Sequence, residues 1–423
     1  MTAPRPPHSS LHRHAVMVGG GAAGIFAAIT AAEAAPDRKV IVLEKSPSLL
    51  AKVRISGGGR CNVTHACFEP KQLAKNYPRG SRELLGPFHR WQPRDTVEWF
   101  QSRGVPLKTE PDGRMFPTTD SSQTIIDCLL DSARRAGVEI RTGIGLADVQ
   151  PSPIAGEAPG TFALKLSDGT GLACDRLLLA TGGLKPGPTL DLIRSLGHTV
   201  APLAPSLFTF HVKDPRIEGL AGLSVGQAIA TIPGTHFEHA GPVLVTHWGL
   251  SGPAILKLSA WAARWAQDHE YRFTVRVNWT GLGAAEVQEK FEGARAAQAV
   301  KAVRNTPLFD LPGRLWLQLI AAAGLADATK WSHLRKDQAL ALQQQLTACD
   351  LQVTGKSMFK EEFVTCGGVE LKEIHFKTME SRLVPGLHFA GEVLDIDGIT
   401  GGFNFQAAWT TGRLAGLAMA EVE

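Results

Sequence analysis

The N-terminal region carries a pattern of apolar and polar positions that predicts a strand, a helix and a second strand. Residues 14–18 are apolar enough for a buried strand, and residues 22–35 are rich in alanine, as in a helix packed closely on a sheet. Residues 39–45 read as another buried strand. Three consecutive glycines separate the first strand from the helix. The pattern predicts a β–α–β unit whose first turn lets a ligand come very close to the backbone.

The turn after the first strand matches the dinucleotide-binding spacing G-x-G-x-x-G. Gly19 permits a tight turn, Gly21 removes a side chain where a pyrophosphate would approach, and Gly24 lets the helix pack closely on the strand. The helix N-terminus offers free N–H groups and partial positive charge to phosphates. Glu44 ends the second strand 20 residues after Gly24, where this fold places an acid on a ribose hydroxyl. The turn predicts a bound dinucleotide.

Two later glycine clusters favour FAD over NAD as that dinucleotide. Residues 161–175 predict a strand, an Asp-Gly turn and a strand, and residues 175–183 predict a strand ending in Ala-Thr-Gly-Gly. Residues 386–416 predict a strand, an acidic loop, a Gly-Gly pair and a helix. This order resembles flavoproteins of the two-dinucleotide type. In them an acidic residue after the last strand, here Glu392, holds the ribityl chain, and the next helix points its N-terminus at the flavin pyrimidine.

Three further stretches narrow the resemblance to one family. The runs R-I-S-G-G-G-R-C-N within residues 52–66 and D-G-I-T-G-G-F-N within residues 364–409 are long and specific, and residues 245–259 add V-T-H-W-G-L-S-G-P-A. The chain is similar to the HI0933-like flavoproteins, also labelled BaiN/YhiN-type or aminoacetone-oxidase-type. The resemblance implies an α/β fold: a Rossmann-type FAD-binding domain of the two-dinucleotide-binding type, with an inserted β-barrel-like domain and a helical insert.

The glycine-rich turns and the resemblance together predict the residues that hold the cofactor. These are Gly19, Gly21, Ala22, Ala23, Gly24, Glu44, Lys45, Lys52, Ser56, Gly57, Gly58, Gly59, Arg60, Cys61, Asn62, Ala180, Thr181, Gly182, Gly183, Gly391, Glu392, Asp397, Gly401, Gly402, Phe403 and Asn404. Arg60 suits a pyrophosphate or an anionic substrate. The glycine triplet 57–59 permits backbone conformations closed to other residues. A loop that only wraps the FAD remains the alternative for residues 56–64.

The order of strand-like and helical patterns predicts the domain boundaries. Residues 1–13 are polar and proline-rich and read as a disordered tail. Residues 14–196 plus 365–423 form the predicted FAD domain, and 197–282 plus 348–364 the β-barrel-like substrate domain. Residues 283–347 lack strand signals and carry helical runs, so they read as a helical insert that could cap the flavin.

Composition and charge restrict the class of protein and hint at a partner. No apolar run reaches the roughly 18 residues of a membrane span, and the N-terminus lacks a signal-peptide core. The six cysteines form no C-x-x-C pair, which favours reduced thiols in a cytoplasmic protein without a metal site. Net charge is +4, yet residues 52–103 hold ten basic and four acidic residues. That excess could contact ribosomal RNA, or it could be a solvated basic face.

Two residues are candidates for proton transfer or other chemistry beside the flavin. Cys61, near Arg60 and Lys52, could donate a proton or act as a reactive thiol, or it could simply be a buried packing residue. His247, placed by the pattern between the barrel and a helix, could act as acid or base, or be a hydrogen-bonded structural histidine. The spacing of Cys61 and Cys67 does not fit a disulfide reductase.

These observations predict an FAD-dependent oxidoreductase. Because only one dinucleotide turn is present, NAD(P)H would visit the flavin transiently as electron donor. The resemblance implies NAD(P)H-linked reduction of an activated C=C bond, in the uracil of ribosomal RNA or in an unsaturated ketosteroid-like enone. Two alternatives stay open: a small-amine oxidase that produces hydrogen peroxide, and a non-catalytic flavin- and RNA-binding factor or redox sensor.

Overall fold

The computed structural model describes residues 14–152, 161–357 and 364–421, so the predicted tail 1–13 lies outside the described part. The chain divides into two compact units, Met1–Leu203 with Val364–Glu423 and Ala204–Phe363. The boundaries predicted from the sequence, at 196/197 and 364/365, lie close to this division. The further separation of a barrel domain from a helical insert stays a prediction.

The first unit is built on a seven-stranded sheet of mostly parallel strands. In spatial order its strands are β19 (Ile374–His375), β20 (Glu380–Ser381), β21 (Leu387–Phe389), β10 (Arg176–Leu179), β1 (His14–Val18), β2 (Lys39–Glu44) and β6 (Glu139–Thr142). The five strands from β21 to β6 run parallel. Strands β1, β2 and β10 are almost wholly buried, as expected of a parallel sheet covered on both faces. This confirms the predicted Rossmann-type α/β class.

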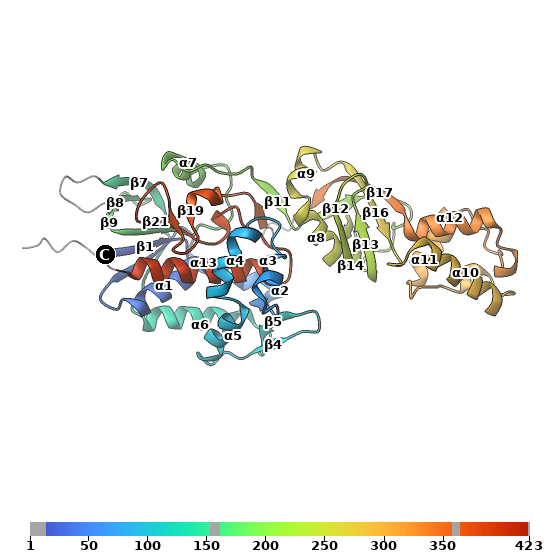
Figure 1. The fold of residues 1–423 in the computed structure, drawn as a ribbon, viewed down its shortest axis with the longest axis horizontal. Helices are drawn as coiled ribbons and strands as arrows, with labels where there is room; N and C mark the ends of the chain where they lie inside the picture. Colours follow the sequence, from blue (N-terminus) through green and yellow to red (C-terminus); the bar gives the residue numbers. More distant parts are fainter. Residues whose placement is uncertain (1–13, 153–160, 358–363, 422–423) are drawn as a thin grey trace, which may run out of the picture. The chain divides into compact units, whose positions relative to one another are not determined.

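Helices α1 (Ala22–Ala34) and α13 (Phe403–Ala420) lie side by side although almost the whole chain separates them (Figure 1). Their close approach depends on small residues. A Cβ on Gly412 would lie 2.6 Å from the Ala23 carbonyl oxygen, and one on Gly416 would lie 2.4 Å from that of Ala27. The C-terminal helix is therefore held against the helix that follows the glycine turn.

Other elements of the first unit surround this central pair. Two three-stranded antiparallel sheets have the orders β3–β5–β4 and β7–β8–β9. The strands of these two sheets are β3 (Thr64–His65), β4 (Leu107–Thr109), β5 (Arg114–Pro117), β7 (Leu146–Ser152), β8 (Thr161–Leu166) and β9 (Gly171–Cys174). This unit also contains strand β18 (Val364–Cys366) and the helices α2 (Ala51–Gly59), α3 (Pro70–Ala74), α4 (Ser81–Arg90), α5 (Pro93–Gln101), α6 (Ser122–Arg135) and α7 (Pro188–Ser195). The pair β8–β9 is the strand–turn–strand expected around the Asp-Gly turn.

The second unit contains a closed six-stranded barrel. Its strand order is β12 (Thr209–Val212), β15 (Gly249–Ser251), β14 (Glu238–Thr246), β13 (Ser224–Thr231), β16 (Phe273–Asn278) and β17 (Cys349–Ser357). The remaining elements are β11 (Ala204–Ser206), α8 (Pro253–Trp261), α9 (Ala263–Asp268), α10 (Ala284–Ala297), α11 (Gly313–Ala322) and α12 (Lys336–Thr347). Helices α10 to α12 fall between β16 and β17 and lie together beside the barrel (Figure 1). One continuous apolar cluster includes barrel residues such as Val275 and helical residues such as Trp316.

His388 on β21 gives the first unit a testable dependence on pH. Its side chain is buried, and its Nδ1–H donates to the Thr378 carbonyl oxygen at 3.1 Å. Burial lowers the pKa of His388 from about 6.5 to about 4, because the charged form would lose its hydration. The unfolded chain therefore binds this proton more readily than the folded chain. The free energy of unfolding should therefore fall by about 3 kcal/mol as the pH falls from above 6.5 to below 4.

The variant His388→Gln keeps a hydrogen-bond donor and removes the titration. We expect its unfolding free energy, measured in urea from pH 7 to pH 4, to fall less steeply than that of the wild type. His375→Gln, at an exposed position on strand β19 of the same sheet, is the matched control and should follow the wild type. Identical slopes for His388→Gln and the wild type would contradict the assignment.

Candidate cofactor site

Four parallel strands end level with one another and bring the predicted cofactor residues to one edge of the sheet. Val18 is opposite both Leu43 and Leu179, and Leu179 is opposite Phe389. The residues that follow these ends are Gly19, Glu44, Ala180 and Ala390. Ligands of open α/β sheets bind outside the carboxyl ends of the strands. The candidate site is this edge.

The glycines of the turn after β1 have two different roles: some are required for packing, and one leaves space for a ligand. Gly19 has φ +115°, and a Cβ there would lie 2.3 Å from the Ala180 carbonyl oxygen; a Cβ on Gly24 would lie 2.0 Å from that of Gly19. These two glycines are required by the fold itself. A Cβ on Gly21 would have no atom within 4 Å. The turn therefore leaves open space at Gly21, beside the N-terminus of α1.

That helix N-terminus offers its first N–H groups to a ligand. Gly21 is the N-cap residue of α1, no side chain caps it, and its first turn holds no acidic residue. The adjacent Glu44 is held by backbone donors: its two carboxylate oxygens accept the N–H groups of Gly20 and Ser46, each at 2.8 Å. Each oxygen keeps a lone pair for a ribose hydroxyl. This arrangement fits a dinucleotide, with phosphates at the helix and a ribose at Glu44.

A second group of predicted residues gathers where β10 and β21 end. Glu392 accepts the N–H of Thr365 at 2.8 Å, and its other oxygen pairs with Lys52 at 2.6 Å. A Cβ on Gly183 would lie 2.8 Å from the Glu392 carboxylate. The Thr181 hydroxyl is buried and has no hydrogen-bond partner among the described residues. A buried hydroxyl of this kind is suited to a hydrogen bond with a ligand.

The N-terminus of α13 forms the far side of this edge. Gly402, with φ +93°, is its N-cap residue, and no side chain caps the helix. A Cβ there would lie 2.5 Å from the Thr64 carbonyl oxygen, so the preceding loop requires glycine. Asn404 fixes that loop by bonding both the N–H and the C=O of Gly398 at 2.8 and 2.9 Å. The uncapped positive end suits negative charge on a ligand.

The glycine triplet 57–59 adopts the left-handed backbone that three glycines permit. Their φ values are +59°, +69° and +82°, and they belong to the kinked helix α2 rather than to a free loop. A Cβ on Gly58 or Gly59 would meet nothing within 4 Å. The kink turns the chain toward Asn62. With its amide oriented to satisfy its neighbours, Asn62 accepts the N–H of Gly402 at 3.0 Å and so joins the triplet to α13.

Arg60 and Asp397, both predicted to hold the cofactor, form ion pairs with other side chains of the chain. Arg60 pairs with Glu110 at 2.6 Å, and its guanidinium lies 4.0 Å from the ring centroid of Phe116. Asp397 has a fully buried side chain whose two oxygens accept from Arg79. Both contacts favour structural roles. Direct contact of either residue with a cofactor stays a prediction.

Cys61 lies in a position that favours packing over reactivity. It is completely buried, and burial raises the pKa of its thiol to about 12. A thiol with this pKa is protonated at neutral pH and is a poor nucleophile. The structure therefore favours the buried packing interpretation over a reactive thiolate near Arg60 and Lys52.

His247 lies one strand earlier than the pattern indicated. It occupies the tight turn that joins the barrel strands β14 and β15, and not the connection from β15 to α8. The error arose because β15 has only three residues, too few to recognise from alternation. Its side chain is exposed and belongs to the second unit. A role for His247 as acid or base stays a prediction.

Sequence reasoning missed the residues that position the site from far along the chain. Thr365, which orients Glu392, lies 27 residues before it, and Arg79 lies 318 residues before Asp397. No local motif marks such partners. Distant partners also reduce the effective positive charge of residues 52–103. Several of its cations pair with acids outside that segment: Lys52 with Glu392, Arg60 with Glu110, Arg79 with Asp397 and Arg103 with Glu33.

One buried cluster has the composition of a hydrolytic triad but lacks its access. The His198 ring bonds Glu373 and Ser381, each at 2.9 Å. The Ser381 oxygen also accepts the N–H groups of Leu383 and Val384, and the cluster is buried. A nucleophile without access cannot attack a substrate, so the cluster joins segments of the fold.

Metal ligation and membrane insertion find no support in the described ranges. Within residues 14–152, 161–357 and 364–421, no group of three or more His, Cys, Asp or Glu side chains could hold a metal ion. No helix in those same ranges is both long enough and apolar enough to cross a membrane.

Comparison with known proteins agrees with the fold. The model of the HI0933-like protein Rossmann domain matches residues 13–418. A ribosomal RNA dihydrouridine synthase of Escherichia coli (strain K12) is 33% identical over 407 residues, which are 94% of this chain and 95% of that protein. A 3-dehydro-bile acid delta(4,6)-reductase of Clostridium scindens is 30% identical over 416 residues, 96% of this chain and 98% of that protein.

A solved structure shares the architecture. The 3-ketosteroid-delta4-(5alpha)-dehydrogenase from Rhodococcus jostii RHA1 has a TM-score of 0.51 at 15% identity, over 99% of this chain and 100% of that one. At this identity the likeness concerns the fold alone.

Proposed function

The chain belongs to the HI0933-like protein family and is an FAD-dependent oxidoreductase, and from that premise we propose that it reduces a carbon–carbon double bond conjugated to a carbonyl group. The proposed substrate is uracil in ribosomal RNA, and the proposed electron donor is NAD(P)H. The observation that carries the proposal is the 33% identity to a ribosomal RNA dihydrouridine synthase over 94% of this chain.

The names of the two relatives describe one kind of chemistry. Dihydrouridine is uridine whose C5=C6 bond has been reduced, and that bond is conjugated to the C4 carbonyl. A delta(4,6)-reductase acts on double bonds that are conjugated to a ketone at C3. In both cases a hydride adds to the alkene carbon remote from the carbonyl, and a proton adds to the neighbouring one. The shared chemistry supports the reaction class, and the higher identity supports uracil as the first substrate to test.

When bound, FAD supplies the hydride that such a reduction needs. This chain's own residues would bind and orient it. The α1 N-terminus and the open space at Gly21 would take the pyrophosphate, and Glu44 would hold a ribose hydroxyl. Glu392, oriented by Thr365, would hold the sugar-alcohol chain. The uncapped N-terminus of α13 would stabilise negative charge at the pyrimidine end of the ring.

The decisive experiment measures dihydrouridine in ribosomal RNA by mass spectrometry, in source cells with and without the gene. We expect the modification to disappear on deletion and to return with the wild-type gene. A variant that does not bind FAD should fail to restore it. An unchanged dihydrouridine level in the deleted strain would refute uracil in ribosomal RNA as the substrate.

A second measurement tests the donor and the competing functions. Anaerobic NADH or NADPH should bleach the flavin absorbance, and an RNA containing the target uridine should restore it. A small enone that restores the absorbance while RNA does not would favour the bile-acid type of substrate. Hydrogen peroxide formed from amines without NAD(P)H would indicate the oxidase. Only slow reoxidation by oxygen would indicate a sensor.

A further inference from the structure

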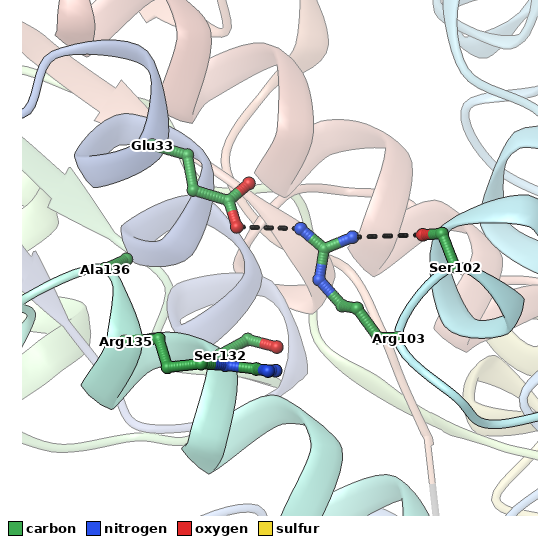
Figure 2. Close-up of a pocket in the computed structure, with 6 residues that line it drawn as sticks. All are labelled: Glu33, Ser102, Arg103, Ser132, Arg135 and Ala136. Carbon is green, nitrogen blue, oxygen red and sulfur yellow. Dashed lines mark hydrogen bonds and ion pairs between the residues drawn. The ribbon is translucent and has the colours of Figure 1, made fainter.

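A polar hollow lies at the edge of the first unit opposite the candidate cofactor site. It has a volume of about 470 Å³ and is lined by Glu33, Ser102, Arg103, Ser132, Arg135 and Ala136 (Figure 2). These residues stand at the C-terminal ends of α1, α5 and α6. Because α1 has 13 residues, its two ends lie about 20 Å apart. The hollow is thus far from the glycine turn at the other end of α1.

The guanidinium of Arg103 is fixed in one wall of the hollow. It pairs with Glu33 at 2.7 Å and donates to the Ser102 hydroxyl at 3.4 Å (Figure 2). It also lies 3.9 Å from the ring centroid of Trp99. Such a group is held in place before any ligand arrives. It can then bind an anion at little cost in side-chain entropy.

Positive charge exceeds negative charge around this wall. Arg135 lines the same space, and its guanidinium forms no hydrogen bond or ion pair with any residue that the structure describes. The nearby Arg413 is attracted by Glu33 and repelled by Arg103, and burial lowers the pKa of its guanidinium. Among the residues that line the hollow, two guanidinium groups, those of Arg103 and Arg135, accompany one carboxylate, that of Glu33. An anionic ligand would offset the excess.

The floor offers a hydroxyl that lacks a strong partner. Ser132 is 3% exposed, and its Oγ has only the weakly hydrogen-bonding sulfur of Cys128 beside it. A phosphate oxygen reaching the hollow would meet this hydroxyl and the guanidinium groups together. Phosphate has the charge and the acceptor oxygens that such a set recognises.

We propose that this hollow, the Arg103–Arg135 pocket, binds a backbone phosphate of the RNA substrate at a distance from the reacting uracil. The inference rests on the proposed function, because only a polyanion with many phosphates would occupy both edges of the unit at once. The pocket would add affinity and fix the orientation of the RNA without reading its sequence.

The last turn of α6 provides a matched pair of variants. Arg134 and Arg135 are adjacent, but only Arg135 lines the pocket, while Arg134 pairs with Asp131 on the exposed face. Both lie near the helix C-terminus, where a cation is favourable whatever it binds. A role in stabilising the helix end therefore predicts equal effects of Arg134→Gln and Arg135→Gln. Phosphate binding predicts an effect of Arg135→Gln alone.

The experiment measures binding of a short fluorescent single-stranded RNA to the FAD-loaded full chain at several salt concentrations. Arg135→Gln should weaken binding about 5- to 10-fold and reduce the salt slope by about one, and Arg135→Lys should restore most of the affinity. Arg134→Gln should match the wild type. Flavin content and the thermal midpoint serve as controls for folding.

Equal effects of the two glutamine variants, no effect of either, or no RNA binding by the wild type would overturn the inference. The proposed function fails separately. If deletion of the gene leaves dihydrouridine unchanged while Arg135→Gln alone weakens RNA binding, the pocket assignment stands and the uracil reductase assignment falls.

Discussion

Replacing Asp397 by asparagine should lower the free energy of unfolding by about 3–5 kcal/mol. The Asp397 side chain is fully buried, that of Arg79 is 11% exposed, and two nitrogens of the guanidinium donate to the two carboxylate oxygens. Asparagine keeps the shape but removes the charge, so the Arg79 cation loses its ion pair with Asp397 in a site that is largely shielded from solvent on the arginine side. The measurement is urea unfolding of the FAD-loaded protein and of the apoprotein.

The expected loss comes from the cation left behind, and a double variant tests that explanation. Arg79→Met with Asp397→Leu removes both charges and should recover much of the stability that Asp397→Asn loses. Asp337→Asn removes a carboxylate from the exposed pair with Arg335 and should leave the unfolding midpoint unchanged. An Asp397→Asn protein as stable as the wild type, with FAD affinity reduced instead, would favour the cofactor role predicted from the sequence.

The N-terminal β–α–β unit could be predicted from sequence because its signals are local. Strand 14–18, helix 22–35 and strand 39–45 correspond to β1, α1 and β2 within one residue. The continuous apolar runs and the glycine spacing are signals that span only a few residues, and the same glycines then decide the turn geometry. The functions expected for Gly19 and Gly24 follow from that geometry: each approaches a backbone oxygen too closely for any side chain.

Partners distant along the chain could not be predicted in the same way. The pairs Arg79–Asp397 and Lys52–Glu392 each join residues more than 300 positions apart in the chain. No sequence pattern near one member of a pair indicates the other. The charge count over residues 52–103 therefore overestimates the net positive charge that this segment contributes to the surface. The order of the barrel strands escaped prediction for the same reason, since β12 pairs with β17 across the whole helical insertion.

Short elements were the other source of error. Strand β15 has only three residues, too few to show an alternating pattern, and His247 was therefore predicted to lie in the wrong connection. Residues 56–64 were expected to form a loop because of the glycine triplet. The structure extends α2 (Ala51–Gly59) into this stretch, although Ser56, Gly57 and Gly58 depart from helical geometry. Glycine permits such a kink but does not require the chain around it to be irregular.

Replacing Gly21 by alanine should weaken FAD binding by roughly 5- to 150-fold while leaving the apoprotein folded. A Cβ at this position would touch no protein atom within 4 Å, and the backbone there is extended, with φ −86°. The methyl group would instead occupy the space left for the pyrophosphate. A misplaced methyl in a packed contact costs about 1–3 kcal/mol, which corresponds to that range of affinity. The measurement is a fluorescence titration of apoprotein with FAD.

Gly24→Ala is the contrasting variant, three residues along the same turn. Its Cβ would lie 2.0 Å from the Gly19 carbonyl oxygen, so the turn must distort even without a cofactor. We expect the Gly24→Ala apoprotein to unfold at lower urea concentration than the wild type, and the Gly21→Ala apoprotein to unfold at nearly the same concentration. If Gly21→Ala binds FAD as tightly as the wild type, the pyrophosphate does not approach this turn. The open space beside α1 would then have to serve another group.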